Sequence, residues 1–238
     1  MALLLSQWMN RLALLALFTR PAIAKFAPSH RQSLWPRSFE FLVFDSDDAF
    51  HDFVGPLMHM CTIMYTQTWG SYYNSSLDAT VEGWTRGHVE SNPVGGGMRA
   101  FTFVQNETGR GVVAFRGTDM GDDGSGVSGQ ADACANAYLR GQYPPECSRF
   151  PEETVDYLTR GLELVERAEA AYPGLDFLMT GHSLGAQLAS LVGAIRGRPA
   201  LTFSAPSVAP ELRSRSAVDP ASVGAWAEVS LYNEWDPL

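Results

Sequence analysis

The sequence of 238 residues is 45% hydrophobic and 18% charged, so it can bury one sizeable core and a single domain is the default. Its formal charge is −9 and it contains no run of Lys and Arg, which argues against nucleic-acid binding and against electrostatic docking on anionic lipid. The three cysteines, Cys61, Cys134 and Cys147, show neither a C-x-x-C pair nor histidine at ligand spacing. No metal site and no cofactor are therefore expected.

Residues 1–24 have the pattern of a targeting segment. Residues 1–11 carry one positive charge, residues 12–18 form a short apolar block, and Ala-Ile-Ala at 22–24 fits a cleavage site. We predict a secretory signal peptide over 1–24, hence a secreted protein or one of the secretory pathway. No acid occurs before Glu40, so an organelle presequence is the alternative. No run of eighteen apolar residues occurs elsewhere, and no transmembrane segment is expected.

Secretion would bring the chain into a compartment where disulfides form. Cys134 and Cys147 would then close a compact loop, whereas Cys61 lies in an apolar helical stretch and is expected to be a buried free thiol. Two N-x-S/T triplets, at Asn74 and Asn106, would be potential glycosylation acceptors.

The N-terminal third contains one predicted strand and one predicted helix. Residues 39–44 form a short apolar run, and the acids that follow it predict a helix start at about Asp47. Apolar residues continue at helical spacing as far as Met64, and Pro56 is expected to kink or restart the helix.

The middle of the chain consists of three segments that differ in composition. Residues 66–97 are rich in Gly, Ser, Asn and Thr and predict an irregular connection without a function. Residues 99–104 and 111–115 are β-rich runs that predict a hairpin with a longer loop. Residues 119–150 are rich in glycine and lack strong periodicity apart from a short helix at 131–139, which indicates either a functional loop or a disordered insertion.

Strands and helices alternate in the C-terminal half. An amphipathic helix is predicted over 155–168, followed by a strand at 175–179, a sharp turn and a helix that continues to about Ile195. Strands at 200–203 and 227–232 follow. This alternation predicts an α/β fold with a mostly parallel sheet and helices on both faces.

The sharp turn reads Gly-His-Ser-Leu-Gly at 181–185, a G-x-S-x-G motif between a strand and a helix. Glycine is needed on both sides because such a turn brings the two backbones too close for side chains. A serine nucleophile also needs a histidine base, a carboxylate to orient it, and donors for the oxyanion. We therefore predict Ser183 as the nucleophile and the backbone N–H of Leu184 as one oxyanion donor.

Four blocks of the sequence resemble the class 3 (fungal-type) lipases in order and separation: VVAFRGTD at 112–119, GHSLG at 181–185, LTFSAPSV at 201–208 and LYNEWDPL at 231–238. The resemblance implies an α/β-hydrolase fold, with one lipase-like domain over 25–238. It also implies hydrolysis of carboxylic esters of acylglycerols or similar lipids through an acyl-enzyme on Ser183, without a cofactor. The expected partner is a lipid or ester substrate, with transient contact to a lipid interface.

The same resemblance assigns two further residues. The backbone N–H of Thr118 would be the second oxyanion donor, and Asp236 would be the acid of the triad. Asp219 competes for that role because it also precedes a proline, although it lies away from a strand end. Residues 119–150 occupy the place of the family's lid, but their glycines and acids depart from an apolar lid.

The catalytic histidine is missing from this pattern. The five histidines are His30, His51, His59, His88 and His182, and none follows Asp236. In the family the histidine lies on a later loop, so the sequence predicts an α/β-hydrolase domain whose C-terminal part is missing; rescue by one of the earlier histidines would need a different chain order. Two alternatives stay open: a catalytically impaired lipid-binding or interaction protein, and a serine hydrolase of non-lipid esters.

Overall fold

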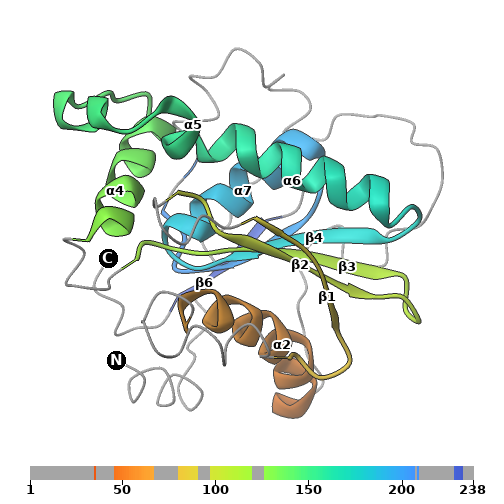
Figure 1. The fold of residues 1–238 in the computed structure, drawn as a ribbon. Helices are drawn as coiled ribbons and strands as arrows, with labels where there is room; N and C mark the ends of the chain where they lie inside the picture. The colour runs from red at the N-terminus through yellow and green to blue at the C-terminus, as the bar shows by residue number, and fades with distance from the viewer. Residues whose placement is uncertain are drawn as a thin grey trace, which may run out of the picture.

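The computed structural model describes residue 35 and residues 46–66, 80–90, 97–119, 126–206, 208 and 228–232. Figure 1 shows the arrangement of these segments, a sheet with helices on both of its faces. The predicted signal peptide at 1–24, the predicted strand at 39–44 and the acids Asp219 and Asp236 lie outside the described residues. These remain predictions.

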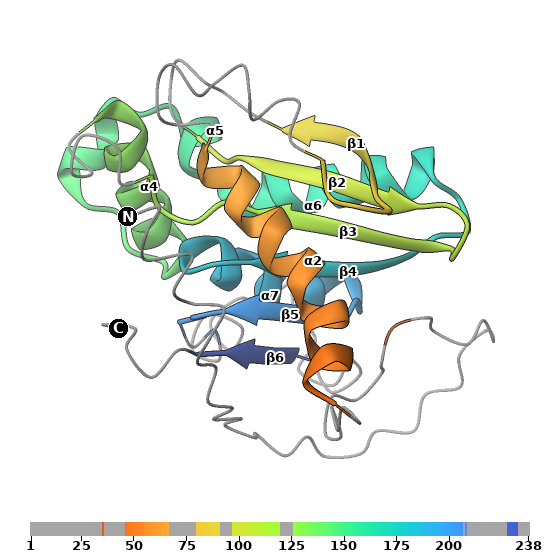
Figure 2. The same cartoon turned by 90° about the horizontal axis from the view of Figure 1, so that it is seen from below.

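Within the residues that the structure describes, the sheet has six strands in the order β1-β2-β3-β4-β5-β6 (Figure 2). The strands are β1 (Thr85–Glu90), β2 (Ala100–Gln105), β3 (Arg110–Phe115), β4 (Asp176–Gly181), β5 (Ala200–Phe203) and β6 (Glu228–Leu231). The first three pair antiparallel, and β3 to β6 pair parallel. The predicted mostly parallel sheet is confirmed. Because parallel strands share a direction, the carboxyl ends of β3 to β6 lie at one edge.

Helices cover the sheet on both sides, as the alternating pattern predicted. The helix α2 (Asp47–Thr66) packs on one face, and α4 (Val127–Leu139), α6 (Tyr157–Ala171) and α7 (Leu184–Arg196) pack on the other. Two short elements, η4 (Pro145–Arg149) and α5 (Glu152–Val155), connect α4 to α6. Among the described residues, no helix is long and apolar enough to cross a membrane.

The strand β3 shows why its sequence is a continuous apolar run. Val113 and Phe115 belong to the core under α6 and α7, whereas Val112 and Ala114 belong to the core under α2. Successive side chains of a strand point to opposite faces, and a strand covered on both faces must be apolar at every position. All four side chains are fully buried.

The structure corrects three details of the predicted elements. The connection at 66–97 contains the strand β1, which pairs with β2 although its sequence is polar. The helix predicted over 155–168 is two helices, because Asp156 ends α5 and caps α6 by accepting a hydrogen bond from the backbone N–H of Thr159 at 3.2 Å. The helix α2 continues through Pro56 as one element, so of the two predicted effects of Pro56 the restart is wrong, and the kink stays a prediction.

The cysteines are arranged as the sequence predicted. Cys134 on α4 forms a disulfide with Cys147 on η4. Cys61 on α2 is a buried free thiol whose sulfur lies 3.7 Å from the hydroxyl of Thr180. Burial raises the pKa of the Cys61 thiol to about 12, and the hydrogen bond with Thr180 opposes this rise.

We expect Cys61 to resist alkylation in the folded chain. At a pKa of about 12, roughly one thiol in ten thousand is ionised at pH 8, and the thiolate is the reactive form. Iodoacetamide followed by peptide mass spectrometry should label Cys61 only after denaturation, and Cys134 and Cys147 only after reduction as well. Equal labelling of Cys61 in the folded and unfolded chain would contradict its buried position.

Candidate active site

Ser183 lies at the turn between β4 and α7, at the carboxyl edge of the parallel strands. Its backbone has φ 55° and ψ −121°, which a residue with a side chain rarely adopts. The backbone N–H of Ser183 donates to the carbonyl of Phe203 at 3.0 Å, which ties the turn to β5. The serine side chain is half-buried. Strain of this kind is typical of a nucleophile elbow, where the turn exposes the serine hydroxyl.

The two glycines of the motif stand where backbones meet. A Cβ atom on Gly181 would lie 2.4 Å from the backbone carbon of Gly185. A Cβ atom on Gly185 would lie 2.2 Å from the carbonyl oxygen of Phe115 and 2.6 Å from the backbone carbon of Arg116. All three distances are below 3.0 Å, which real Cβ atoms essentially never show. The motif thus packs β4, α7 and the end of β3 at backbone contact, which explains its two glycines.

Gly117 and Tyr65 join the end of β3 to the elbow. The hydroxyl of Tyr65, near the end of α2, hydrogen-bonds with His182 Nδ1 at 2.7 Å and with the backbone N–H of Gly117. A Cβ atom on Gly117 would lie 2.0 Å from that hydroxyl and 2.5 Å from the carbonyl oxygen of His182. Burial raises the pKa of Tyr65, so its hydroxyl stays protonated. One tyrosine therefore holds together both segments on which the predicted oxyanion donors lie.

A buried cluster around Asp132 supports the segment that follows β3. One guanidinium nitrogen of Arg116 donates to both carboxylate oxygens of Asp132, at 3.0 and 2.7 Å. The backbone N–H of Asp119 donates to the same carboxylate at 2.7 Å, and the hydroxyl of Tyr157 donates to it as well. Arg116 Nε also donates to the carbonyl of Gly117 at 3.2 Å. We call these residues (Arg116, Asp119, Asp132 and Tyr157) the Asp132 cluster.

The Asp132 cluster holds Thr118 from both sides, because the carbonyl of Gly117 and the N–H of Asp119 are its neighbours in the chain. The Asp132 side chain is fully buried, which raises the pKa of its carboxyl. The charge of Arg116 and the hydrogen bonds from Tyr157, Asp119 and Arg116 lower this pKa, but they do not cancel the rise. Asp132 lies on α4 together with the fully buried Ala131 and Ala135. The α4 part of the predicted lid is therefore anchored in the body of the protein.

The predicted oxyanion donors lie at the elbow. Leu184 is the first residue of α7, and the first N–H groups of a helix have no partner within it. Thr118 directly follows Gly117, whose position is packed against the backbone of His182. The close contact between Gly117 and His182 therefore lies one residue before Thr118 on one segment and one residue before Ser183 on the other. Both N–H groups belong to the edge of the sheet at which Ser183 lies.

The site residues of the last block are described only in part. The predicted final strand exists as β6, which pairs parallel with β5 and so points to the same edge as β4. Beyond it, the hydroxyl of Tyr232 donates to the carbonyl of Ala205 in the loop that follows β5. In that loop Ser204 has φ 53°, a second strained backbone at this edge. The predicted acid, Asp236, lies four residues further on and outside the described residues.

The described histidines occupy different parts of the fold. His182 precedes Ser183, and its ring packs edge-on against Tyr65 with centroids 5.7 Å apart. His51 and His59 lie at exposed positions of α2. His88 lies on β1, three strands away from β4, where its ring faces Tyr172. His30 is outside the described residues.

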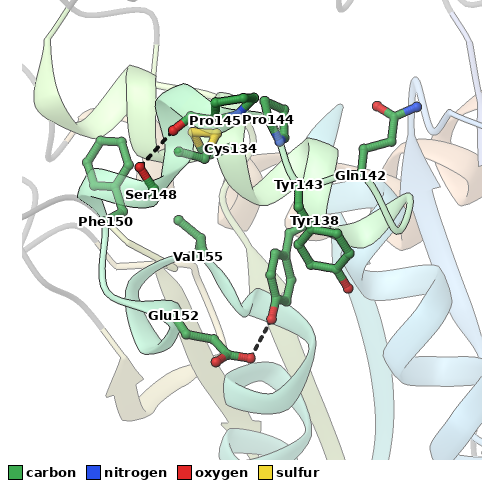
Figure 3. A pocket seen from close by; sticks show the side chains of 11 residues that line it. Cys134, Tyr138, Gln142, Tyr143, Pro144, Pro145, Ser148, Phe150, Glu152 and Val155 are labelled. Atoms are coloured by element: carbon green, nitrogen blue, oxygen red, sulfur yellow. Dashed lines mark hydrogen bonds between the residues drawn. A yellow bond between two sulfur atoms is a disulfide. The ribbon is translucent and has the colours of Figure 1, made fainter.

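A surface cavity of about 320 Å³ lies away from the elbow, where α4, η4 and α5 meet (Figure 3). Its walls include Tyr138, Tyr143, Phe150 and the disulfide. Ser183, Thr118 and Leu184 are not among its lining residues. Within the described segments, no three His, Cys, Asp or Glu side chains are grouped to hold a metal ion.

Neither the role of Tyr65 nor the Asp132 cluster was predicted from the sequence. Asp132 is a single acid in the alanine-rich stretch 131–135, and Arg116 is a charge at the end of an apolar strand. A charge at such a place is a signal for a buried ion pair, but its partner is sixteen positions away, across residues without periodicity. Only the packing of α4 against β3 brings the two together.

No protein-family model matches the chain. Curated proteins named "Putative lipase ATG15" are similar to it in Cryptococcus neoformans var. neoformans serotype D, with 25% identity over 172 residues covering 61% of this chain and 33% of that protein. The protein of that name in Mycosarcoma maydis is 26% identical over 174 residues, covering 60% and 34%. The chain spans about a third of the length of these relatives.

Solved structures of fungal lipases also align with the chain. The lipase of Rhizopus microsporus var. chinensis gives a TM-score of 0.41 at 16% identity, covering 68% of this chain and 59% of that one. The Lip2 lipase of Yarrowia lipolytica gives 0.40 at 12% identity, covering 68% and 60%. The predicted resemblance to fungal-type lipases is confirmed by the curated relatives, and the fold class by the sheet order of this chain.

Proposed function

We propose that this protein is a serine carboxylic-ester hydrolase in which Ser183 attacks the ester carbonyl and forms an acyl-enzyme. The observation that carries the proposal is the backbone of Ser183, with φ 55° at the turn between β4 and α7. A strained, non-glycine residue at that turn has a cost in stability that an idle serine would not explain. The glycines at 181 and 185 support the same reading, because they allow the backbone contact that makes the turn sharp.

Charge that develops on the carbonyl oxygen would be stabilised by the backbone N–H groups of Leu184 and Thr118. The first lies at the positive end of α7, which favours a negative charge. The second lies on a segment held by Tyr65 and by the Asp132 cluster, so its direction is preset before the substrate arrives. Preset donors of this kind are worth about 3 to 4 kcal/mol each in the transition state.

Asp236 would be the acid that orients the base, since it follows in sequence the strand β6, whose carboxyl end lies at the edge of the sheet where Ser183 lies. The similarity to proteins named as lipases supports esters of acylglycerols or similar lipids as substrates. The disulfide between Cys134 and Cys147 supports passage through an oxidising compartment, in line with the signal peptide proposed for 1–24. We propose none of the histidines in the described part of the chain as the general base.

A second candidate function is binding of a lipid or ester without turnover. His182 favours it, since this histidine beside the nucleophile has its Nδ1 engaged by Tyr65 and packs against that ring. The elbow would then hold an acyl group or carboxylate without attacking it. Removal of the base from a triad lowers the rate by several orders of magnitude but leaves some catalysis by the oxyanion donors.

The proposal is tested by covalent labelling with a fluorophosphonate probe, which reacts with an activated serine. We expect slow labelling of the wild-type chain at Ser183, located by peptide mass spectrometry, and none of the Ser183→Ala variant. Ser148→Ala is the matched control, because Ser148 is exposed on η4 and its hydroxyl donates to the carbonyl of Pro145. It should label as the wild type does.

The other outcomes separate the candidates. Equal labelling of the wild type and Ser183→Ala would exclude Ser183 as the nucleophile. No labelling of either, combined with binding of a fluorescent fatty acyl ligand that Ser183→Ala retains, would favour the binding protein. Where labelling occurs, the ratio of hydrolysis rates for long-chain and short-chain esters separates a lipase from a general esterase.

A further inference from the structure

We propose that Asn106 is a site of N-linked glycosylation. The triplet Asn106-Glu107-Thr108 has the required N-x-T pattern with a residue other than proline in the middle. It lies in the turn between β2 and β3, and all three of its residues are exposed. Such triplets occur often by chance, and a triplet is modified only where it is accessible. The sequence alone does not show whether these residues are exposed, whereas the structure does.

The turn tolerates a large group on Asn106 because its backbone bonds are made by other atoms. The N–H of Thr108 donates to the carbonyl of Gln105 at 3.2 Å, and the N–H of Gly109 donates to the carbonyl of Asn106 at 3.2 Å. Gly109 has φ 72°, which completes the reversal of the chain. A sugar on the side-chain amide of Asn106 leaves each of these backbone bonds intact.

The location also keeps the sugar away from Ser183. The turn joins the start of β3, and the elbow packs against its end at Phe115, about 17 Å away along the strand. Figure 2 shows the β2–β3 turn at one end of the sheet and α4, which carries Asp132, at the other. A bulky, hydrated group is therefore compatible with an open edge at the elbow.

The disulfide is an independent observation that points to the same compartment. Cys134 and Cys147 form a bond that persists in oxidising surroundings, such as the secretory pathway where N-glycans are added. In the transfer, the amide nitrogen of Asn106 bonds to C1 of an oligosaccharide carried on a lipid diphosphate. The bond from C1 to the diphosphate oxygen breaks, the lipid diphosphate leaves, and the amide loses one proton. The proposal does not depend on the activity of Ser183.

The test is expression of the full chain in a yeast secretory host, in an Asn74→Gln background because Asn74 begins the other triplet. We expect one mobility shift that peptide N-glycosidase F removes, with deamidation of Asn106 seen by mass spectrometry. Asn106→Gln and Thr108→Ala should abolish the shift, whereas Thr108→Ser keeps the required hydroxyl and should retain it. Thermal unfolding of each variant checks that it is folded.

Three results would overturn the proposal. The first is recovery of the chain with Asn106 unmodified, whether from the medium or from the cells. The second is a shift that persists in both Asn106→Gln and Thr108→Ala, since the sugar would then be attached elsewhere. The third is a shift lost equally in Thr108→Ala and Thr108→Ser, because the hydroxyl would then not be the recognised group.

Discussion

Replacing Gly185 by alanine is expected to destabilise the chain by more than about 3 kcal/mol, the upper range for overpacking in a core. The added methyl group would stand 2.2 Å from the carbonyl oxygen of Phe115 and 2.6 Å from the backbone carbon of Arg116. Both atoms belong to the backbone at the end of β3, so no side-chain rotation relieves the contact. The first turn of α7 would have to move away from the sheet.

The measurement is thermal unfolding followed by circular dichroism. For a domain of this size, a loss of 3 kcal/mol corresponds to a fall in Tm of roughly 6 to 12 °C. Since domains are stable by only about 5 to 15 kcal/mol, much of the variant is expected in the insoluble fraction. A Gly185→Ala variant with the Tm of the wild type would contradict the contact between β3 and α7.

Gly55→Ala is the matched control for this substitution. Gly55 lies inside α2, and apart from its chain neighbours and the backbone of its own helix a Cβ atom there would meet nothing within 4 Å. Alanine is the better helix former by roughly 0.5 to 1 kcal/mol, but a Cβ atom on the residue before Pro56 disfavours the helical backbone, so the control should change Tm little. The same chemical change is thus expected to have very different effects at two glycines, because only one of them is in backbone contact with another element.

Replacing Asp132 by alanine is expected to cost about 3 to 5 kcal/mol, the range for breaking a buried ion pair. The change leaves the Arg116 guanidinium without its carboxylate, and the N–H of Asp119 and the hydroxyl of Tyr157 without their acceptor. These groups are buried, so water cannot replace the lost partner without opening the core. Urea unfolding measures the loss as a shift of the midpoint.

Two control variants separate the charge from the acceptor atoms. Asp132→Asn keeps one oxygen and the shape, and burial already opposes the charge by raising the pKa of Asp132, so Asn should cost clearly less than Ala. Glu163→Gln removes an exposed partner of Arg167 at 4.0 Å on α6 and should cost under about 0.5 kcal/mol. If Asp132→Ala were as mild as Glu163→Gln, the Asp132 cluster would contribute nothing to stability.

The parts of the fold that sequence analysis predicted are those with a local signal. The apolar run of β3, the strand-turn-helix around Ser183 and the cysteine spacing each occupy a short window, and all three appear in the structure. The strand β1 was missed because its sequence, TRGHVE, is polar and contains a glycine; it is a strand because β2 offers an edge to pair with. Pairing is not encoded in a single window.

In the candidate site, too, some features have a local sequence signal and others depend on tertiary contacts. By itself, the sequence determined which residues stand at the elbow and the predictions made for them: a serine between two glycines, a strand end rich in polar groups, and a resemblance to fungal-type lipases. The tertiary structure decided what holds these parts in place. Tyr65 reaches the elbow across 117 positions of sequence, and Asp132 meets Arg116 across sixteen. Such contacts depend on how α2 and α4 pack on opposite faces of the sheet, and packing is a property of the whole chain.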